Sequence, residues 1–507
     1  MPFRVRESPQ ERSFLFIDSQ DDVSQERGVG RQKMAFLSKV AHQRRKRESV
    51  ERLKHTRSTK TPENTPGDEE EERSMHAVTT QGRVALTGYM GQGYVDPFNA
   101  RPVRMTDSMN MYFHHFVVQV SPTTIPLDGA QEGMIWAQRS NGLLANFYTG
   151  LFLAAGNKAM LERKHGVDKL AISRTSQDAI RLRVEAIKCL NQLVQTPVTA
   201  ATESTILCVS IMNHCEALNA QAMASQTHMA GLNTLIDLVG GLEVLKRTTI
   251  STIYQGDIAN AALHDSKPRF TMLPRFLCEV HGATEMFLYD INTSKFEYGH
   301  WLHPSLIPLG TRFTQAPWYA ELDPAMKTTI SASRRLIVHF EMATMLPRLV
   351  RPTDKDLSII LLHHLLSLSC PDDYLDEPLR RTLFIYTYLR VWHFGNFPVM
   401  GYIVDSLRQC LIPRILRLHT AAPDLLLWIL FMGAMASQQH DCHPWFVSHL
   451  RGAAAHLELK EWGEARAVLA EFFYTDQRGY TTGEEIWNEV LTPDYTCIAP
   501  RVSEIRD

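Results

Sequence analysis

The sequence has no Cys-x-x-Cys pair, no long hydrophobic run and almost no net charge. Its eight cysteines are scattered over 507 residues, which excludes a zinc ribbon and a dense disulfide framework and predicts a reducing compartment. The longest strongly apolar run, residues 425–436, is well short of the about 20 residues of a membrane-spanning helix and predicts a buried core helix. The N-terminal run FLFI is too short for the core of a signal peptide. We therefore expect a soluble intracellular protein with no membrane partner.

Motifs of catalytic and metal chemistry are missing as well. No GxSxG, HExxH or SxxK pattern lies on a credible scaffold, so we expect no catalytic residue, no cofactor and no enzymatic activity. The sequence HDCH at 440–443 carries zinc-type donors, but adjacent ligands rarely converge on one ion, so it predicts a loop between core helices and no metal. The glycine-rich GYMGQGY at 88–94 lacks the spacing of a phosphate-binding loop.

Several histidines, cysteines and aromatic residues favour structural roles. The histidine pairs 114–115 and 363–364 predict helix-face or buried hydrogen-bonded side chains. Cys208 and Cys215 are seven residues apart on one expected helix and predict two small buried hydrophobic side chains. The aromatic segment 384–394 leaves two alternatives, a ligand pocket between helices or, the favoured one, core packing.

The charge of the chain is strongly segregated near its N-terminus. The whole sequence has a formal charge of −2, yet residues 27–60 hold twelve Lys/Arg against Glu48 and Glu51. This segment therefore carries +10 and the rest of the chain −12. Residues 32–55 contain no Gly or Pro and many helix-forming residues, which predicts a basic helical segment.

This basic segment contains the candidate site of the sequence. Two cationic clusters separated by ten residues are typical of a bipartite nuclear-import signal read by an import carrier, and the same side chains suit the phosphates of double-stranded DNA. A plain solvated helix is the remaining alternative. No leucine heptads follow Lys54, so the segment is not a bZIP basic region. The candidate residues for DNA binding or nuclear localisation are Arg31, Lys33, Lys39, Arg44, Arg45, Lys46, Arg47, Arg52 and Lys54.

Composition predicts four regions along the chain. Residues 1–26 are expected to be a flexible N-terminus and residues 27–60 the basic helical segment. Residues 61–92 contain two prolines and an acidic DEEEE block, which predicts a disordered linker because too little apolar surface is present to offset the ordering entropy. Residues 93–500 are expected to form a helical domain.

Hydrophobic periodicity within this domain is helical and not strand-like. Residues 177–194 keep a three-or-four-residue apolar step after Ser176, a candidate N-cap. Residues 221–239 end at Gly240-Gly241, where a left-handed cap is available. We expect an all-α fold: a large irregular multi-helix domain of stacked helix pairs with a disordered, basic N-terminal arm. Further helices are predicted at 205–218, 330–346, 357–369, 378–394, 402–419 (kinked or split at Pro413), 425–437 and 463–473.

Three segments together resemble the fungal-specific transcription factor domain, also called fungal transcription-factor-like. They are GYVDPFNARPV at 93–103, HMAGLNTLIDLVGGLEVL at 228–245, and PDLLLWILFMGAMAS at 423–437 followed by WFVSHL at 445–450. The resemblance covers about residues 93–490 and consists of packing and turn motifs. It implies a helical regulatory domain, a nuclear location and a role in transcription.

This chain departs from that family at its N-terminus. Family members often carry an N-terminal binuclear zinc cluster of six cysteines, whereas the first cysteine here is Cys189. Zinc-cluster readout of DNA is therefore not expected.

These observations lead to three hypotheses. The first is a nuclear transcriptional regulator whose basic arm serves nuclear import and contacts the DNA backbone. The second is a helical nuclear co-regulator or scaffold that does not bind DNA itself, and the third is a soluble small-molecule sensor or enzyme. Homo- and hetero-oligomeric forms are compatible with all three.

Overall fold

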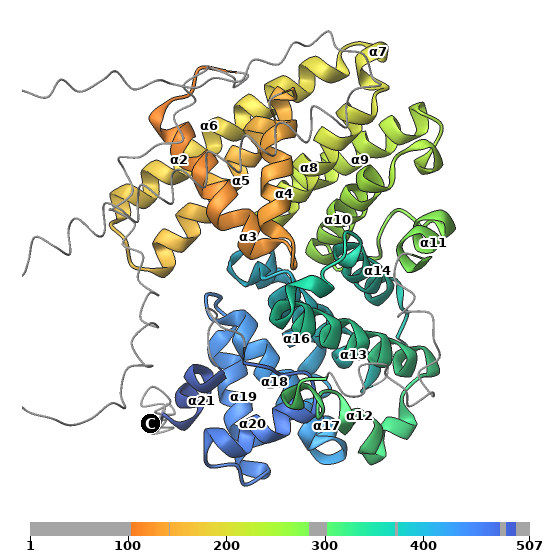
Figure 1. Ribbon diagram of the computed structural model, residues 1–507. Coiled ribbons are helices and arrows are strands. Elements are labelled where there is room, and N and C mark those ends of the chain that lie inside the picture. Colours follow the sequence, from red (N-terminus) through yellow and green to blue (C-terminus); the bar gives the residue numbers. More distant parts are fainter. Residues whose placement is uncertain (1–102, 141, 283–301, 371–373, 477–482, 493–507) are drawn as a thin grey trace, which may run out of the picture. The chain divides into compact units, whose positions relative to one another are not determined.

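The structure of the chain, a computed structural model, describes residues 103–140, 142–282, 302–370, 374–476 and 483–492. Every regular element within these ranges is a helix and none is a strand, which confirms the predicted all-α fold (Figure 1). The chain divides into two units, and the second, Ala85–Asp507, contains all the described residues. The regions predicted at 1–26, 27–60 and 61–92 lie outside them.

The first half of the described chain forms ten α-helices and a π-helical turn. Pro197 at the start of α7 and Pro274 at the start of α11 occupy positions where a missing N–H costs little. The elements are α2 (Asp107–His115), η2 (Phe116–Val120), α3 (Ser121–Thr124), α4 (Gly129–Arg139), α5 (Leu144–Lys164), α6 (Lys169–Val194), α7 (Pro197–Ala200), α8 (Glu203–Leu218), α9 (Ala222–Leu238), α10 (Arg247–Leu263) and α11 (Pro274–Gly282).

The second half continues in the same way. Its elements are α12 (Thr311–Gln315), α13 (Pro324–Met345), α14 (Asp354–Ser367), α15 (Asp376–Tyr386), the π-helical turn η8 (Thr387–Val391), α16 (Val399–Leu411), α17 (Ile415–Ala421), α18 (Pro423–Ser437), α19 (His443–His456), α20 (Trp462–Glu471) and α21 (Gly483–Leu491). Extensive contacts join α5 with α6, α8 with α9 and α10, and α18 with α19. The domain is thus built from helix pairs packed on one another.

Helix α18 lies at the centre of the second half. All its side chains from Asp424 to Ser437 are buried, as expected for a helix that is apolar on every face. It contacts α15, α16, α17, α19 and α21. Trp428 packs against Phe313 and Phe472, with ring centroids 5.8 and 5.7 Å apart. The core helix predicted at 425–437 is confirmed.

Two turn signals in the sequence are also confirmed. Gly240 and Gly241 have φ of 96° and 101°, and the N–H of Gly241 bonds to the carbonyl of Ile236 at 2.9 Å. This double-glycine cap ends α9 at the predicted place. Pro413 lies in the break between α16 and α17, so the helix predicted at 402–419 is split there.

The start and the buried face of α6 differ from the prediction. The helix begins at Lys169 and not at 177, because the carboxylate of Asp168 caps the N–H groups of Leu170 and Ala171. Ser176 is therefore inside the helix. Ile180 on the predicted apolar stripe is 62% exposed, and the buried side chains are Thr175, Ala179, Leu182, Ala186 and Leu190.

Helix ends elsewhere differ for similar reasons. The helix predicted from 330 begins at Pro324, where Asp323 provides the cap. The single helix predicted over 378–394 ends as α15 at Tyr386 and continues only as the π-helical turn, because His393 adopts a left-handed φ of 53°. No helix within the described ranges is long and apolar enough to cross a membrane.

The contact between α18 and α19 gives a stability prediction. A Cβ at Gly433 would lie 2.2 Å from a ring carbon of Phe446, a fully buried side chain. We expect Gly433→Ala to lower the free energy of unfolding by about 1–3 kcal/mol because the ring has no room to move. Urea denaturation measures this change.

Gly452 on α19 provides the matched control. A Cβ there would meet no atom within 4 Å, so Gly452→Ala should raise the free energy of unfolding by about 0.5–1 kcal/mol. Equal stability of the two variants would contradict this account of the contact.

Candidate functional site

The nine basic residues singled out in the sequence lie outside the described residues. These are Arg31, Lys33, Lys39, Arg44, Arg45, Lys46, Arg47, Arg52 and Lys54. The glycine-rich segment 88–94 also lies outside. The described part of the chain contains the other candidates, and each can be placed.

The HDCH sequence forms the turn between α18 and α19, as predicted. The Nδ1 atom of His443 lies 3.1 Å from both the hydroxyl of Ser437 and the carbonyl of Ala434, and its Nε2 lies 2.8 Å from the carboxylate of Glu489. The ring of His440 instead faces Gly401 on α16. Across the described ranges, no three His, Cys, Asp or Glu side chains are grouped so that they could hold a metal ion.

The other histidines and cysteines have the structural roles predicted for them. His363 lies 2.8 Å from the carbonyl of Phe270, and His364 lies 3.0 Å from the hydroxyl of Thr329. His115 lies 3.0 Å from Asn157, and burial lowers the pKa of its imidazole to about 4. Burial raises the pKa of the Cys208 thiol to about 12, so this cysteine is protonated at neutral pH.

Packing is the role of the aromatic segment 384–394. Phe384, Tyr388, Trp392 and Phe394 are all at most 4% exposed. The rings of Phe384 and Tyr388 stack with centroids 4.6 Å apart. Of the two alternatives for this segment, core packing is confirmed.

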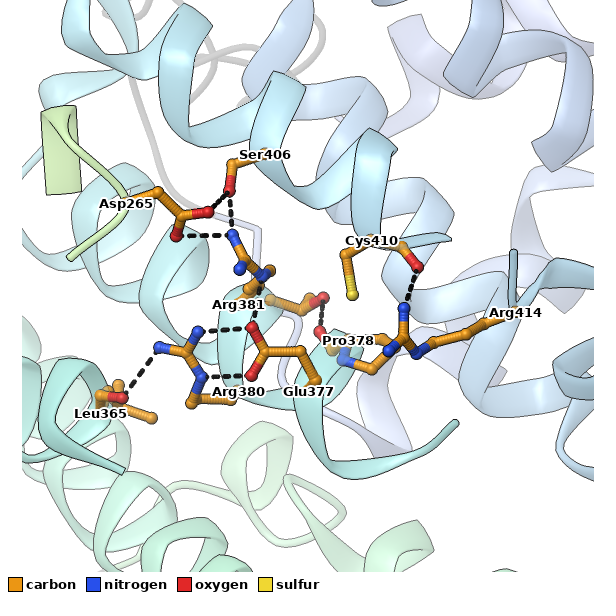
Figure 2. A network of polar contacts seen from close by, with 10 residues as sticks. Asp265, Leu365, Glu377, Pro378, Arg380, Arg381, Ser406, Cys410 and Arg414 are labelled. Atoms are coloured by element: carbon orange, nitrogen blue, oxygen red, sulfur yellow. Dashed lines mark hydrogen bonds and ion pairs between the residues drawn. The ribbon is translucent and has the colours of Figure 1, made fainter. Parts of the chain in front are cut away.

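A small pocket lies where the end of α10 meets α14, α15 and α16, beside a network of polar contacts (Figure 2). Its volume is about 20 Å³, enough for about one water molecule. Arginine, aspartate and serine side chains face one another across it, in the best-formed charged cluster of the described residues. The pocket is lined by Ala262, Asp265, Leu366, Arg380, Arg381, Phe384, Ile403 and Ser406.

Glu377 is the centre of this network. It accepts two hydrogen bonds from the guanidinium of Arg380 and one from Nε of Arg381, each of 2.6 Å. Arg380 also donates to the carbonyl of Leu365 at 3.0 Å, at the end of α14. The i,i+3 and i,i+4 spacing places both arginines on one side of α15, so that a single carboxylate holds both.

The second guanidinium extends the network to α10 and α16. Arg381 donates to the carboxylate of Asp265 at 2.9 Å and to the hydroxyl of Ser406. Ser406 donates to the other oxygen of Asp265 at 3.1 Å. Asp265 has a φ of 48° just beyond α10, a conformation that aspartate tolerates better than most residues. Three helices and the end of a fourth are thereby tied together.

The positive and negative charges of this cluster balance one another. Burial alone would raise the pKa of Glu377, but the hydrogen bonds and charges of Arg380 and Arg381 outweigh it and hold the pKa below its ordinary value. Two guanidinium groups face two carboxylates, so the described cluster has no net charge. Its geometry suits a structural clamp between helices and leaves little room for a substrate or a cofactor.

The sequence carried a signal for part of this clamp. The stretch DEPLRR at 376–381 has the i,i+3 and i,i+4 acid–base spacing of an ion-paired helix start. Asp265 lies 116 residues from Arg381, so no local pattern could predict that half of the network.

Comparisons with known proteins identify no relative of this chain. No family model matches it, and neither a curated protein nor a solved structure shows significant similarity.

Removing the central carboxylate gives the second prediction. We expect Glu377→Gln to lower the free energy of unfolding by about 3–5 kcal/mol, because the largely buried Arg380 loses its carboxylate partner and Arg381 keeps only that of Asp265. The loss should diminish as the pH falls below about 4. A carboxyl with a depressed folded-state pKa stabilises above its unfolded pKa and loses that contribution on protonation. Urea denaturation over a pH series measures both effects.

Asp405→Asn is the control for this variant. Asp405 pairs with Arg408 on the same helix, and both side chains are partly exposed, so the expected loss is under about 1 kcal/mol. If Glu377→Gln cost no more than this control, the cluster would not be a clamp.

Proposed function

We propose that this protein is a nuclear transcriptional regulator. The basic segment 27–60 serves nuclear import and contacts the phosphate backbone of DNA, and the helical domain supplies regulation or assembly. One observation carries the proposal: twelve cations and two acids lie within 34 residues of a chain whose net charge is −2. A packed apolar core has no counter-charges for so many cations. A polyanion such as DNA neutralises them, and its own condensed counterions are released when they bind.

The segment contains the chemistry for affinity but little for sequence selection. Arg44, Arg45, Lys46 and Arg47 form a continuous cationic run, and such side chains bind phosphates without regard to base sequence. The same run, with Arg31 and Lys33 before it, has the two-cluster spacing that acidic grooves of an import carrier accept. Selection of particular genes would then come from protein partners of the helical domain.

The features of the described domain favour a role in assembly over a role in catalysis. Its pocket beside Arg380 and Arg381 holds about 20 Å³ and its charges are already paired. The resemblance to the fungal-specific transcription factor domain is consistent with this role. Two of its segments are structural here, since 228–245 contains the glycine cap of α9 and 423–437 is the buried α18.

A helical co-regulator that does not touch DNA is the second candidate. The observation that favours it is that no cysteine precedes Cys189 in this sequence, which therefore does not include the six-cysteine zinc cluster with which members of the resembled family often read DNA. The basic segment would then serve import alone.

Duplex binding over a salt series tests the first candidate against the second. We expect the full-length protein to bind a mixed-sequence duplex of about 20 base pairs with an affinity that falls steeply between about 50 and 200 mM salt. Changing Arg44, Arg45, Lys46 and Arg47 to Gln should weaken binding and flatten the slope by about 2–4, because each phosphate contact contributes about 0.9. A wild-type protein that does not bind at low salt would favour the co-regulator.

Nuclear import by the same segment is tested separately. We expect the four-Gln variant, as a fluorescent fusion, to lose most of its nuclear accumulation because the carrier recognises the cationic run. The control changes four scattered cations of the helical domain to Gln: Lys246, Arg269, Arg348 and Lys460. Unchanged accumulation of the four-Gln variant would contradict import through this segment.

A further inference from the structure

The turn between α5 and α6 carries a cluster of cations that the described domain does not neutralise. Arg163 and Lys164 end α5, Lys169 begins α6, and Arg174 follows one turn later. All four are exposed. We call these four residues the α5–α6 basic tip.

The carboxylates nearest in sequence are already in use. Glu162 is buried and paired with Lys158. Asp168 accepts the backbone N–H groups of Leu170 and Ala171 at 3.0 and 3.2 Å. Residues 163–174 contain four Lys/Arg against one Asp, so the tip has a net charge of +3.

The tip contrasts with several cations elsewhere in the domain. Arg247, Arg312 and Lys355 pair with carboxylates on other segments. Within the described residues Lys164, Lys169 and Arg174 have no such partner, and Arg163 contacts only the hydroxyl of Ser176, at 3.2 Å. Three of these cations have no partner among the described residues and the fourth contacts only a hydroxyl, so all four charges are available to an external anion.

The fold holds the tip in a fixed geometry. Gly166 adopts a φ of 64°, and the N–H of Val167 bonds to the carbonyl of Glu162 at 2.9 Å. This closes α5 four residues before α6 begins. The two helices pack extensively along their lengths (Figure 1), so the cations project from a rigid helical hairpin.

A row of cations continues from the tip along α6, interrupted by Asp178 and Glu185, with which two of them pair. Arg181 and Lys188 follow Arg174 at intervals of seven residues and therefore share its helix face. Their side chains are 75% and 61% exposed, and each pairs only with an acid on its own helix. The row from Arg174 to Lys188 spans about 21 Å at the rise of an α-helix, which is long enough to face several phosphates of a duplex.

We propose that the α5–α6 basic tip is a second, sequence-independent phosphate-binding surface for double-stranded DNA. The inference rests on the proposed function in taking DNA as the partner, but it adds a separate site within the folded domain. The tip and the basic segment belong to one chain. Once one of them binds a duplex, binding of the other is intramolecular, which raises the overall affinity. It carries cations and no arrangement suited to reading base edges.

The test uses the full-length protein with Arg163, Lys164, Lys169 and Arg174 changed to Gln. Gln is a good helix former, so the hairpin should remain folded, which circular dichroism and thermal unfolding check. Binding of the mixed-sequence duplex over the salt series should weaken at least about tenfold near 100 mM, and the slope should flatten by about 2–4. Arg163→Lys with Arg174→Lys should retain wild-type binding, because phosphate attraction depends on charge.

The control is the variant with Gln at Lys246, Arg269, Arg348 and Lys460, which removes equal charge from scattered positions. A tip variant that binds duplex like this control, while the basic-segment variant binds weakly, overturns the tip and leaves the proposed function standing. Binding lost only in the tip variant supports the tip and overturns the role of the basic segment. If the wild-type protein binds no duplex, both proposals are overturned. Polyglutamate is the probe for an acidic protein partner. If the tip variant lost binding to polyglutamate but bound duplex normally, the tip would be a site for an acidic protein and the DNA proposal would be overturned.

Discussion

Burial of α18 is the constraint on which the rest of the second half depends. A helix that is apolar on every face cannot lie at a surface, so other helices must enclose it completely. α15, α16, α17, α19 and α21 provide that enclosure. Close approach needs small residues at the contacts, and Gly433 is one because the ring of Phe446 occupies the place of its side chain. The irregular order of helices around α18 follows from this enclosure more than from any repeat.

Enclosing one helix with others brings polar side chains into the interior, where each charge needs a partner. Asp356 is fully buried and meets Arg247 and Ser251. Asp424 meets Arg312 and the indole N–H of Trp318. Such pairs stabilise little compared with apolar packing, but loss of one partner is costly because the other charge stays buried. They therefore fix which helices are neighbours.

The sequence predicted the fold class and many helix positions because those signals are local. The double glycine after α9, Pro413 between α16 and α17, and the apolar run of α18 each act within a few residues. The start of α6 differs from the prediction because Asp168 caps the helix at Lys169. Its buried face differs in part, because Ile180 and Val184 are exposed while Ala179 and Ala186 pack inward. The ion pairs were beyond prediction, since Arg247 and Asp356 are 109 residues apart and Arg312 and Asp424 are 112 apart. The nine predicted site residues lie outside the described structure.

The burial of apolar helices also limits where the charged side chains that bind partners can lie. Buried cations need carboxylate partners inside the domain, as at Arg247 and Arg312, and residues 27–60 contain too few acids to neutralise their own cations. Lys169 is exposed and lies at the start of α6, where a cation opposes the helix dipole, whereas Arg163 and Lys164 lie in the last turn of α5, where the dipole favours them. Packing within the described domain therefore does not account for Lys169. Binding through exposed charges outside the core is sensitive to ionic strength, because salt screens such charges. The fold depends on apolar burial and is much less sensitive to it.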